Sequence, residues 1–315
     1  MKQTNENKSR FQPALASLFG ILFVSTASIF IRVAQVEVSS IVIAASRLLI
    51  ASIVLVPIAL IHYWEQLRKL SRLDLVKGFL SGVFLALHFV LWISSLEYTS
   101  VASSVVLVTT TPLWVALLSP LVLKESIKKS VIVGLLVSML GAVLVGLSNT
   151  CNFQNGRLAC LTLTITGRAM LGNFLALFGA WMAAGYMLIG RQLRKRINTV
   201  AYTAMVYGIA AVILLFVVII RSEPVFTYSA ETYICLLALG ILPQLLGHTL
   251  FNWALKYVSA AFVSLTLLGE PIGTIILALI FLKESPTLLE GVGAVLIMIG
   301  ILIGSVGKDK PVNGA

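Results

Sequence analysis

The chain has 315 residues, of which 59% are hydrophobic and 11% are charged, with a mean hydropathy of +1.01 and a formal net charge of +11. A soluble globular protein could not cover so much apolar surface with polar side chains, so lipid must be the outer solvent. Backbone groups find no water in hydrocarbon, and the apolar runs lack the period-two alternation of barrel strands. The composition therefore predicts an all-α integral membrane protein.

Ten apolar segments are long enough to cross a bilayer, which takes about 20 residues of helix. In chain order they cover residues 13–31, 40–62, 75–96, 100–122, 130–147, 172–190, 199–220, 231–254, 258–281 and 288–306. A long connection separates the first five from the last five. We therefore expect a first five-helix unit at 1–150, a connecting loop at 151–171 and a second five-helix unit at 172–315.

The second span carries the strongest polar signal, Arg47, with apolar residues on both sides. An arginine at the centre of a membrane helix costs about 2.5–3.5 kcal/mol on insertion scales, so it should face a cavity or a partner. One interpretation is a cation that binds an anionic group of a substrate. The other is a structural residue that extends to the interface or pairs with a fixed carboxylate.

Polar and aromatic side chains also recur in the third and eighth spans. His88 and Trp92 stand four residues apart, and Gln244, His248 and Asn252 follow at intervals of four, which places each set on one stripe of a helix. We expect both stripes to line one central cavity and to contact a substrate. For the two histidines, hydrogen-bonded packing is the alternative interpretation.

Two prolines interrupt the fourth and ninth spans. Pro112 follows Thr111, and Pro271 follows Glu270. Proline removes a backbone donor and kinks a helix, so a broken helix with a carboxylate resembles the discontinuous-helix sites of secondary carriers. Glu270 could pair with an arginine, bind a substrate ammonium group or carry a coupling proton. It could also serve only to satisfy the backbone groups that Pro271 leaves free.

The chain has three cysteines. Cys235 lies in an apolar span, where it is expected to pack as a small residue. Cys151 and Cys160 both lie in the connecting loop, and a disulfide between them is compatible with an external compartment. Bonded and free thiols both fit this spacing, and a bond would tether the connection between the two halves.

The two halves share one sequence pattern at a constant offset of 159 residues. The offset lays residues 96–102 on 255–261 and makes further pairs, namely Pro112 with Pro271, Leu123-Lys124-Glu125 with Leu282-Lys283-Glu284, Gly134 with Gly293, and Gly141 with Gly300. Because each half crosses the membrane five times, the second half enters from the opposite side. The halves are thus inverted repeats, which in carriers hold the substrate between them near the bilayer midplane.

The distribution of positive charge predicts the orientation, because Lys and Arg near helix ends favour the cytoplasm. With both termini cytoplasmic, 17 of the 23 Lys and Arg residues lie inside and five outside, while Arg47 lies within a span. The connecting loop is then external. Topology accounts for the net charge, so no nucleic-acid partner is expected. The plasma (inner) membrane is the default location, with membrane lipid around the bundle.

Several chemistries have no motif in the sequence. A phosphate-binding loop, a G-x-S-x-G nucleophile motif and clustered metal ligands are all missing, so ATP-driven transport, enzymatic activity, a metal and a cofactor are not expected. Glycines recur in the closing helix of each half, as in the G-x-x-x-G of Gly300 and Gly304. They permit close helix packing within a monomer or in a homodimer.

The patterns around Pro112 and Pro271, the two Leu-Lys-Glu triplets and the glycines after them resemble the EamA-type carriers of the drug/metabolite transporter superfamily over nearly the whole chain. Arg47 is similar to the arginine of that family's second helix. The resemblance implies ten helices in two inverted five-helix repeats, cytoplasmic termini, a central cavity and movement of small metabolites, often export of amino acids. First repeats of the family often carry Glu before the proline, whereas this chain has Thr111 there. A coupling scheme that needs one carboxylate in each repeat therefore has none at this position of the first repeat.

These features predict a secondary, alternating-access transporter of a small polar or zwitterionic metabolite, in particular an amino-acid or metabolite exporter. Its partners would be a small-molecule substrate and membrane lipid. Other classes fit parts of the pattern. An organellar nucleotide-sugar carrier would share the architecture, and a lipid translocase or a scaffold would not respond to solutes. An intramembrane cofactor protein could use His88 and His248 as haem ligands.

Overall fold

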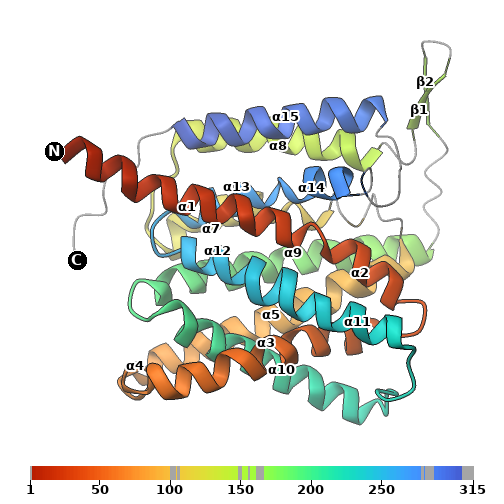
Figure 1. Cartoon of the computed structure of the whole chain (residues 1–315). Coiled ribbons are helices and arrows are strands. Elements are labelled where there is room, and N and C mark those ends of the chain that lie inside the picture. Colours follow the sequence, from red (N-terminus) through yellow and green to blue (C-terminus); the bar gives the residue numbers. More distant parts are fainter. Residues whose placement is uncertain are drawn as a thin grey trace.

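The computed structural model describes residues 2–99, 104, 107–147, 151–154, 157–160, 167–277, 280 and 287–306. Figure 1 shows a helical bundle with one small β-hairpin at its edge. In this part of the chain, six helical stretches are long and apolar enough to cross a membrane, and four shorter apolar helices accompany them. These segments confirm the predicted helical membrane fold.

The first repeat contains α1 (Lys2–Val24), α2 (Ala27–Ala34), α3 (Ser40–His62), α4 (Trp64–Arg68), α5 (Arg72–Tyr98), α7 (Thr111–Val122) and α8 (Lys129–Leu147). The first span, predicted as one helix, is divided between α1 and α2. At the break, the hydroxyl of Ser25 donates to the carbonyl of Ile21 and that of Thr26 to the carbonyl of Phe23, both over 2.7 Å. Such side-chain bonds to the preceding turn compete with the helix ladder and bend it.

The hairpin and the second repeat follow as β1 (Cys151–Gln154), β2 (Arg157–Cys160), α9 (Gly167–Arg194), α10 (Thr199–Ile220), α11 (Ala230–Leu239), the π-helix η1 (Gly240–His248), α12 (Thr249–Ala254), α13 (Ala260–Leu267), α14 (Glu270–Leu277) and α15 (Leu288–Val306). The segments α11, η1 and α12 follow one another directly, so the predicted span 231–254 is one helical path. Pro243 lies within η1, where the missing N–H coincides with wider i→i+5 turns.

Polar side chains cap several helices where the chain reverses direction. Ser71 accepts from the amide of Asp74, whose carboxylate accepts in return from the Ser71 amide, so the two form a capping box at the start of α5. Asn198, Ser229 and Ser259 accept backbone amides at the starts of α10, α11 and α13. These bonds satisfy terminal N–H groups that hydrocarbon could not solvate.

The last helices of the two repeats, α8 and α15, lie side by side along one edge of the bundle (Figure 1). The hydroxyl of Ser138 donates to the carbonyl of Ile297, its own counterpart 159 residues later, over 3.2 Å. On either side of this contact, Gly134 faces the backbone of Gly300 and Gly141 faces the backbone of Gly293. Under the offset, Gly293 is the counterpart of Gly134 and Gly300 is the counterpart of Gly141, so the two contacts are equivalent. The internal symmetry of the sequence is therefore present in the packing.

Candidate substrate site

Arg47 forms the centre of the candidate site. It lies two turns into α3 and is completely buried. Its Nε donates to Oε1 of Gln244 in η1 over 2.9 Å, and its guanidinium carbon lies 3.9 Å from the centroid of the Phe89 ring on α5. Nη1 and Nη2 have no hydrogen-bond partner among the described residues. Four of the five N–H groups of the guanidinium are therefore free for another acceptor.

This arrangement stabilises the guanidinium only in part. A desolvated cation over an aromatic face gains about 2 kcal/mol, whereas a buried donor without an acceptor costs about 1–3 kcal/mol. The unpartnered Nη1 and Nη2 of Arg47 therefore outweigh the contact with Phe89. A ligand with two anionic oxygens would match the planar fork and remove this cost.

Gln244 supplies a second free donor beside the guanidinium. The side chain is completely buried, its Oε1 is occupied by Arg47, and its Nε2 has no partner in the described part of the chain. Gln244 directly follows Pro243 in η1. Irregular π-turns are frequent at functional sites because they re-aim side chains from a helix. Gln244 is thus a polar contact point next to Arg47.

The aromatic wall of the site comes from α5 and η1. His88 stacks on Trp92, with ring centroids 6.1 Å apart and 9° between the ring planes, and its Nδ1 lies 2.9 Å from the carbonyl oxygen of Gly179 on α9. His248 meets the edge of Phe89 at 5.3 Å. The Phe89 ring also lies 4.8 Å from that of His88, so Phe89 joins Arg47 and both histidines. An aromatic residue within an apolar run gave no signal in the sequence.

Asn252 lies in a neighbouring tyrosine cluster and has no contact with the guanidinium in the described structure. Its Nδ2 donates to the hydroxyls of Tyr186 and Tyr207 and to the carbonyl oxygen of His248, the last over 2.8 Å. Its backbone carbonyl oxygen accepts from Nε of Arg194 over 2.9 Å. Asn252 thus holds the helices next to the site together and does not contact the guanidinium of Arg47. The sequence pattern did not indicate the tyrosines around it.

Glu270 begins α14, and two residues separate it from the last residue of α13 at Leu267. Its carboxylate interacts electrostatically with Arg47, but no ion pair joins these two described side chains. Its backbone carbonyl accepts from the hydroxyls of Ser25 over 3.0 Å and Thr274 over 3.1 Å. The helix break therefore has its own hydroxyl partners, and the carboxylate is left available near the guanidinium.

The two prolines differ in what the structure describes. Pro271 is the second residue of α14, but its side chain lies outside the described part. Pro112 is the buried second residue of α7, where a missing N–H costs no helical bond. The preceding Thr111 donates to the carbonyl of Val108 over 2.8 Å and closes the turn before the helix. Pro112 thus shapes the start of α7 rather than the surroundings of Arg47.

Cys151 and Cys160 are directly opposed in the register of the β1–β2 hairpin. Directly opposed residues on antiparallel strands have Cα atoms about 4.5–5.5 Å apart, which is within the range that a disulfide spans. Their side chains lie outside the described part, so the bond stays a prediction. Among the described residues, no group of three or more His, Cys, Asp or Glu side chains could hold a metal ion.

Comparison with known proteins places these features in one family. The EamA-like transporter family matches residues 12–147 and 170–306. An uncharacterized transporter of Clostridium kluyveri is 26% identical over 81% of this chain and 80% of its own length. The uncharacterized transporter YyaM of Bacillus subtilis is 27% identical over 76% of this chain and 75% of its own. The pseudopaline exporter CntI of Pseudomonas aeruginosa is 28% identical over 74% of this chain and 76% of its own length.

The fold also matches a solved structure. A crystal structure aligns with a TM-score of 0.75 and 18% identity over 93% of this chain and 96% of its own. At this identity the match speaks for the fold alone. The family match covers both five-helix repeats, and the relatives are named as transporters. The chain therefore belongs to the EamA-like transporter family and is an integral membrane transporter rather than an enzyme.

Proposed function

We propose that the protein is a secondary, alternating-access exporter of a small polar or zwitterionic metabolite that carries a carboxylate or a similar anionic group. The observation that carries this proposal is the pair of unpartnered nitrogens on the completely buried Arg47. A charge at this depth is kept where it has a task, because a purely structural arginine would have its donors satisfied.

The surroundings of Arg47 fit the different parts of such a solute. The guanidinium fork would bind the two oxygens of a carboxylate, and Nε2 of Gln244 would add a third donor. Phe89, His88 and Trp92 would contact the remainder of the solute. Glu270 offers one anionic group in the same electrostatic environment, which suits a solute that also carries an ammonium group.

The orientation and the division into units belong to the same proposal. Both termini would be cytoplasmic in the plasma (inner) membrane, the loop 151–171 would be external, and the units 1–150 and 172–315 would move against each other as a monomer or within a homodimer. The excess of positive charge on one side of the membrane supports this orientation. Export is supported by one relative that is named as an exporter of pseudopaline.

The test is a thermal-shift screen of the purified protein in detergent against amino acids, nucleotides, sugars and polyamines. A ligand that binds only the folded state stabilises it by about 2.7 kcal/mol at 100 times its Kd. We expect carboxylate-bearing solutes to raise the melting temperature of the parent protein. Arg47→Gln should lose this response, while Arg68→Gln, which changes an exposed arginine paired only with Glu65, should keep it.

Transport then decides the assignment. In proteoliposomes loaded with the stabilising solute, Arg47→Gln should abolish efflux while the protein remains inserted and monodisperse. Full activity in Arg47→Gln would remove Arg47 from the site. Stabilisation by lipids alone would favour a lipid translocase, stabilisation by nucleotide sugars would favour a carrier of that class, and a haem absorption band would point to a cofactor protein that uses His88 and His248.

A further inference from the structure

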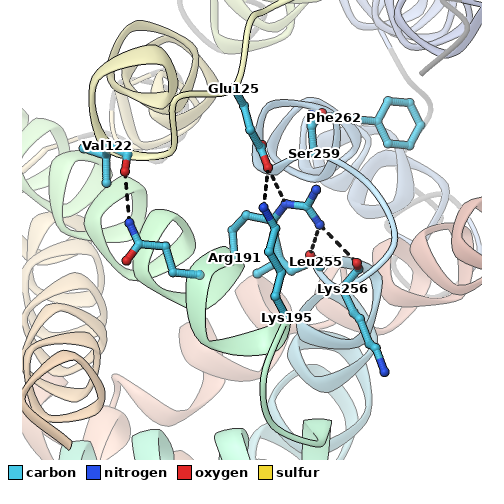
Figure 2. A network of polar contacts seen from close by, with 9 residues as sticks. Val122, Glu125, Arg191, Lys195, Leu255, Lys256, Ser259 and Phe262 are labelled. Carbon is cyan, nitrogen blue, oxygen red and sulfur yellow. Dashed lines mark hydrogen bonds and ion pairs between the residues drawn. The ribbon is translucent and has the colours of Figure 1, made fainter. Parts of the chain in front are cut away.

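A second polar cluster joins the two repeats at one end of the bundle (Figure 2). Arg191 lies in the last turn of α9, and its Nε donates to Oε1 of Glu125 over 3.0 Å. Nζ of Lys195, one turn later, binds the same oxygen over 3.1 Å. Glu125 follows α7 and belongs to the first repeat, whereas Arg191 and Lys195 belong to the second. The cluster is therefore an ionic bond between the two halves.

Arg191 also binds the end of α12. Its Nη1 donates to the carbonyl oxygens of Leu255 over 2.6 Å and Lys256 over 3.1 Å, as Figure 2 shows. The Arg191 side chain is only 4% exposed and that of Glu125 only 19%. Water therefore screens this pair weakly, and removal of one partner would leave a buried charge without compensation.

The backbone before Glu125 is adapted to this contact. Lys124 has a φ of 55°, in the left-handed region that residues with a side chain rarely adopt. This conformation turns the chain sharply after α7 ends at Val122, and Glu125 follows at once. Non-glycine residues hold such a conformation where the surrounding contacts impose it, and the bond from Arg191 to Glu125 is one such contact.

The offset of 159 residues assigns counterparts at the opposite end of the bundle to Arg191 and to its two backbone acceptors, whereas Lys195 falls on the apolar Val36. It places Arg191 on Arg32 and the acceptors at the end of α12 on Leu96 and Glu97 at the end of α5. Neighbouring hydrogen bonds follow this offset in the structure, since Gln35 donates to the Ile93 carbonyl and Arg194 to that of Asn252. The two ends of the bundle are thus built from matching contacts.

The two arginines nevertheless differ in state. Arg191 is buried and holds three acceptors, whereas Arg32 is exposed. Within the described residues, Arg32 has neither an ion pair nor a hydrogen bond from its side chain. Among the described residues, the matched bonds of Gln35 and Arg194 are formed at both ends, whereas the bonds of an arginine to the carbonyls beyond them are formed by Arg191 alone.

We infer that Arg191 and Arg32 are the two alternating gate residues of the transport cycle. Arg191, bound to Glu125 and to the end of α12, keeps the proposed cytoplasmic end closed in the conformation described here. In the opposite conformation the repeats exchange shapes, Arg191 releases its acceptors, and Arg32 binds the carbonyls of Leu96 and Glu97 at the external end. The inference rests on the proposed alternating access and orientation, because inverted repeats exchange conformations when a carrier turns over.

The test measures access from each side of the membrane and needs no substrate. A cysteine at Ala184 lies two turns before Arg191 on the same face of α9, and a cysteine at Ser25 is its counterpart before Arg32. Both parent side chains are completely buried. Each cysteine is placed in a full-length chain without native cysteines, and its reaction with a membrane-impermeant maleimide is timed in vesicles of either orientation.

The variants Arg191→Gln and Glu125→Gln should each raise cytoplasmic labelling of Ala184→Cys at least fivefold and lower external labelling of Ser25→Cys. The variant Arg32→Gln should have the opposite effect on both positions. Gln192→Ala is the matched control, because it removes an uncharged, exposed hydrogen bond of 3.0 Å from α9 to the carbonyl of Val122 in the same region. It should leave both rates within twofold of the parent.

Unchanged labelling in both Arg191→Gln and Glu125→Gln, in protein that elutes as the parent does, would overturn the inference. The exchange of the two charges, Arg191→Glu with Glu125→Arg, guards against misfolding, since partial recovery of the parental rates shows that the pair itself sets access. If access shifts as expected but no solute is transported, the gates stand and the proposed function fails. If solute is transported and access does not shift, transport stands and these gates fail.

Discussion

The crossing of α8 and α15 permits a sharp prediction about glycine. In Gly141→Ala the new Cβ would lie 2.5 Å from the carbonyl oxygen of Gly293 and 2.9 Å from the amide nitrogen of Ile297. Both are backbone atoms, which cannot rotate out of the way as a side chain can. The two helices must therefore move apart at this contact and lose the packing that small residues allow.

The magnitude follows from a comparison with Gly291→Ala. Gly291 lies on α15, the helix that packs against the α8 of Gly141, and a Cβ at Gly291 would meet nothing within 4 Å. Both substitutions gain the higher helix propensity of alanine, about 1 kcal/mol. This term is common to both, so their difference is the cost of overpacking, about 1–3 kcal/mol. Gly291→Ala should therefore be stabilising, and Gly141→Ala should be less stable than it by this amount.

Thermal unfolding in detergent, followed by size-exclusion chromatography of the heated samples, measures this difference. Gly141→Ala should melt several degrees below Gly291→Ala, with the parent chain between them or close to one of them. Gly300→Ala provides a second test, because its Cβ would meet the Ser138 side chain and the Gly134 backbone. Equal melting temperatures for Gly141→Ala and Gly291→Ala would refute the close backbone contact at the crossing.

Three further results are expected. Asn252→Ala should lower the unfolding free energy by about 1–3 kcal/mol, because buried tyrosine hydroxyls lose their amide partner; unchanged thermal unfolding would contradict this. Mass spectrometry after alkylation should find Cys151 bonded to Cys160 in protein purified without reductant, and two alkylated thiols would exclude the bond. A backbone N–H bond at the start of α11 lowers the pKa of Glu37. The stabilisation that this bond gives is present at pH values above the pKa of Glu37 in the unfolded chain. It is lost as the pH falls through the lower pKa of Glu37 in the folded protein, so Glu37→Gln should make the melting temperature less dependent on acid pH.

Three of the long apolar helices could be predicted from the sequence to the residue. The segments 40–62, 199–220 and 288–306 coincide with α3, α10 and α15. Each is a continuous apolar run that ends at polar or capping residues, so composition alone sets its limits. The glycines that recur in the closing helix of each half predicted close helix packing within a monomer or in a homodimer. The structure shows which helices meet, because α8 packs against α15.

Local irregularities could not be predicted in the same way. The break between α1 and α2 depends on hydroxyl groups that bond to the preceding turn, and Ser and Thr within an apolar run occur equally in straight helices. The π-turn at η1 depends on packing around Pro243, which an ordinary kink would also accommodate. Such features are decided by the tertiary neighbours of a helix, which periodicity does not describe.

The candidate site shows the same division. Arg47 and Gln244 were predicted because polar groups are costly in lipid and therefore conspicuous. Phe89 was not predicted, since an aromatic side chain in a membrane helix is unremarkable until a cation lies over it. Arg191 counted only as a positive charge near a helix end and Glu125 only as part of a repeated Leu-Lys-Glu triplet, because no sequence pattern indicates that these two charges meet across the repeats.

The two-fold contact between α8 and α15 also bears on how the protein arose. When residue i of one unit touches residue j of the other and j touches i in return, the interface is isologous, which is the geometry that two identical chains adopt in a dimer. The α8–α15 crossing is thus the interface that two copies of one five-helix ancestor would form in antiparallel orientation.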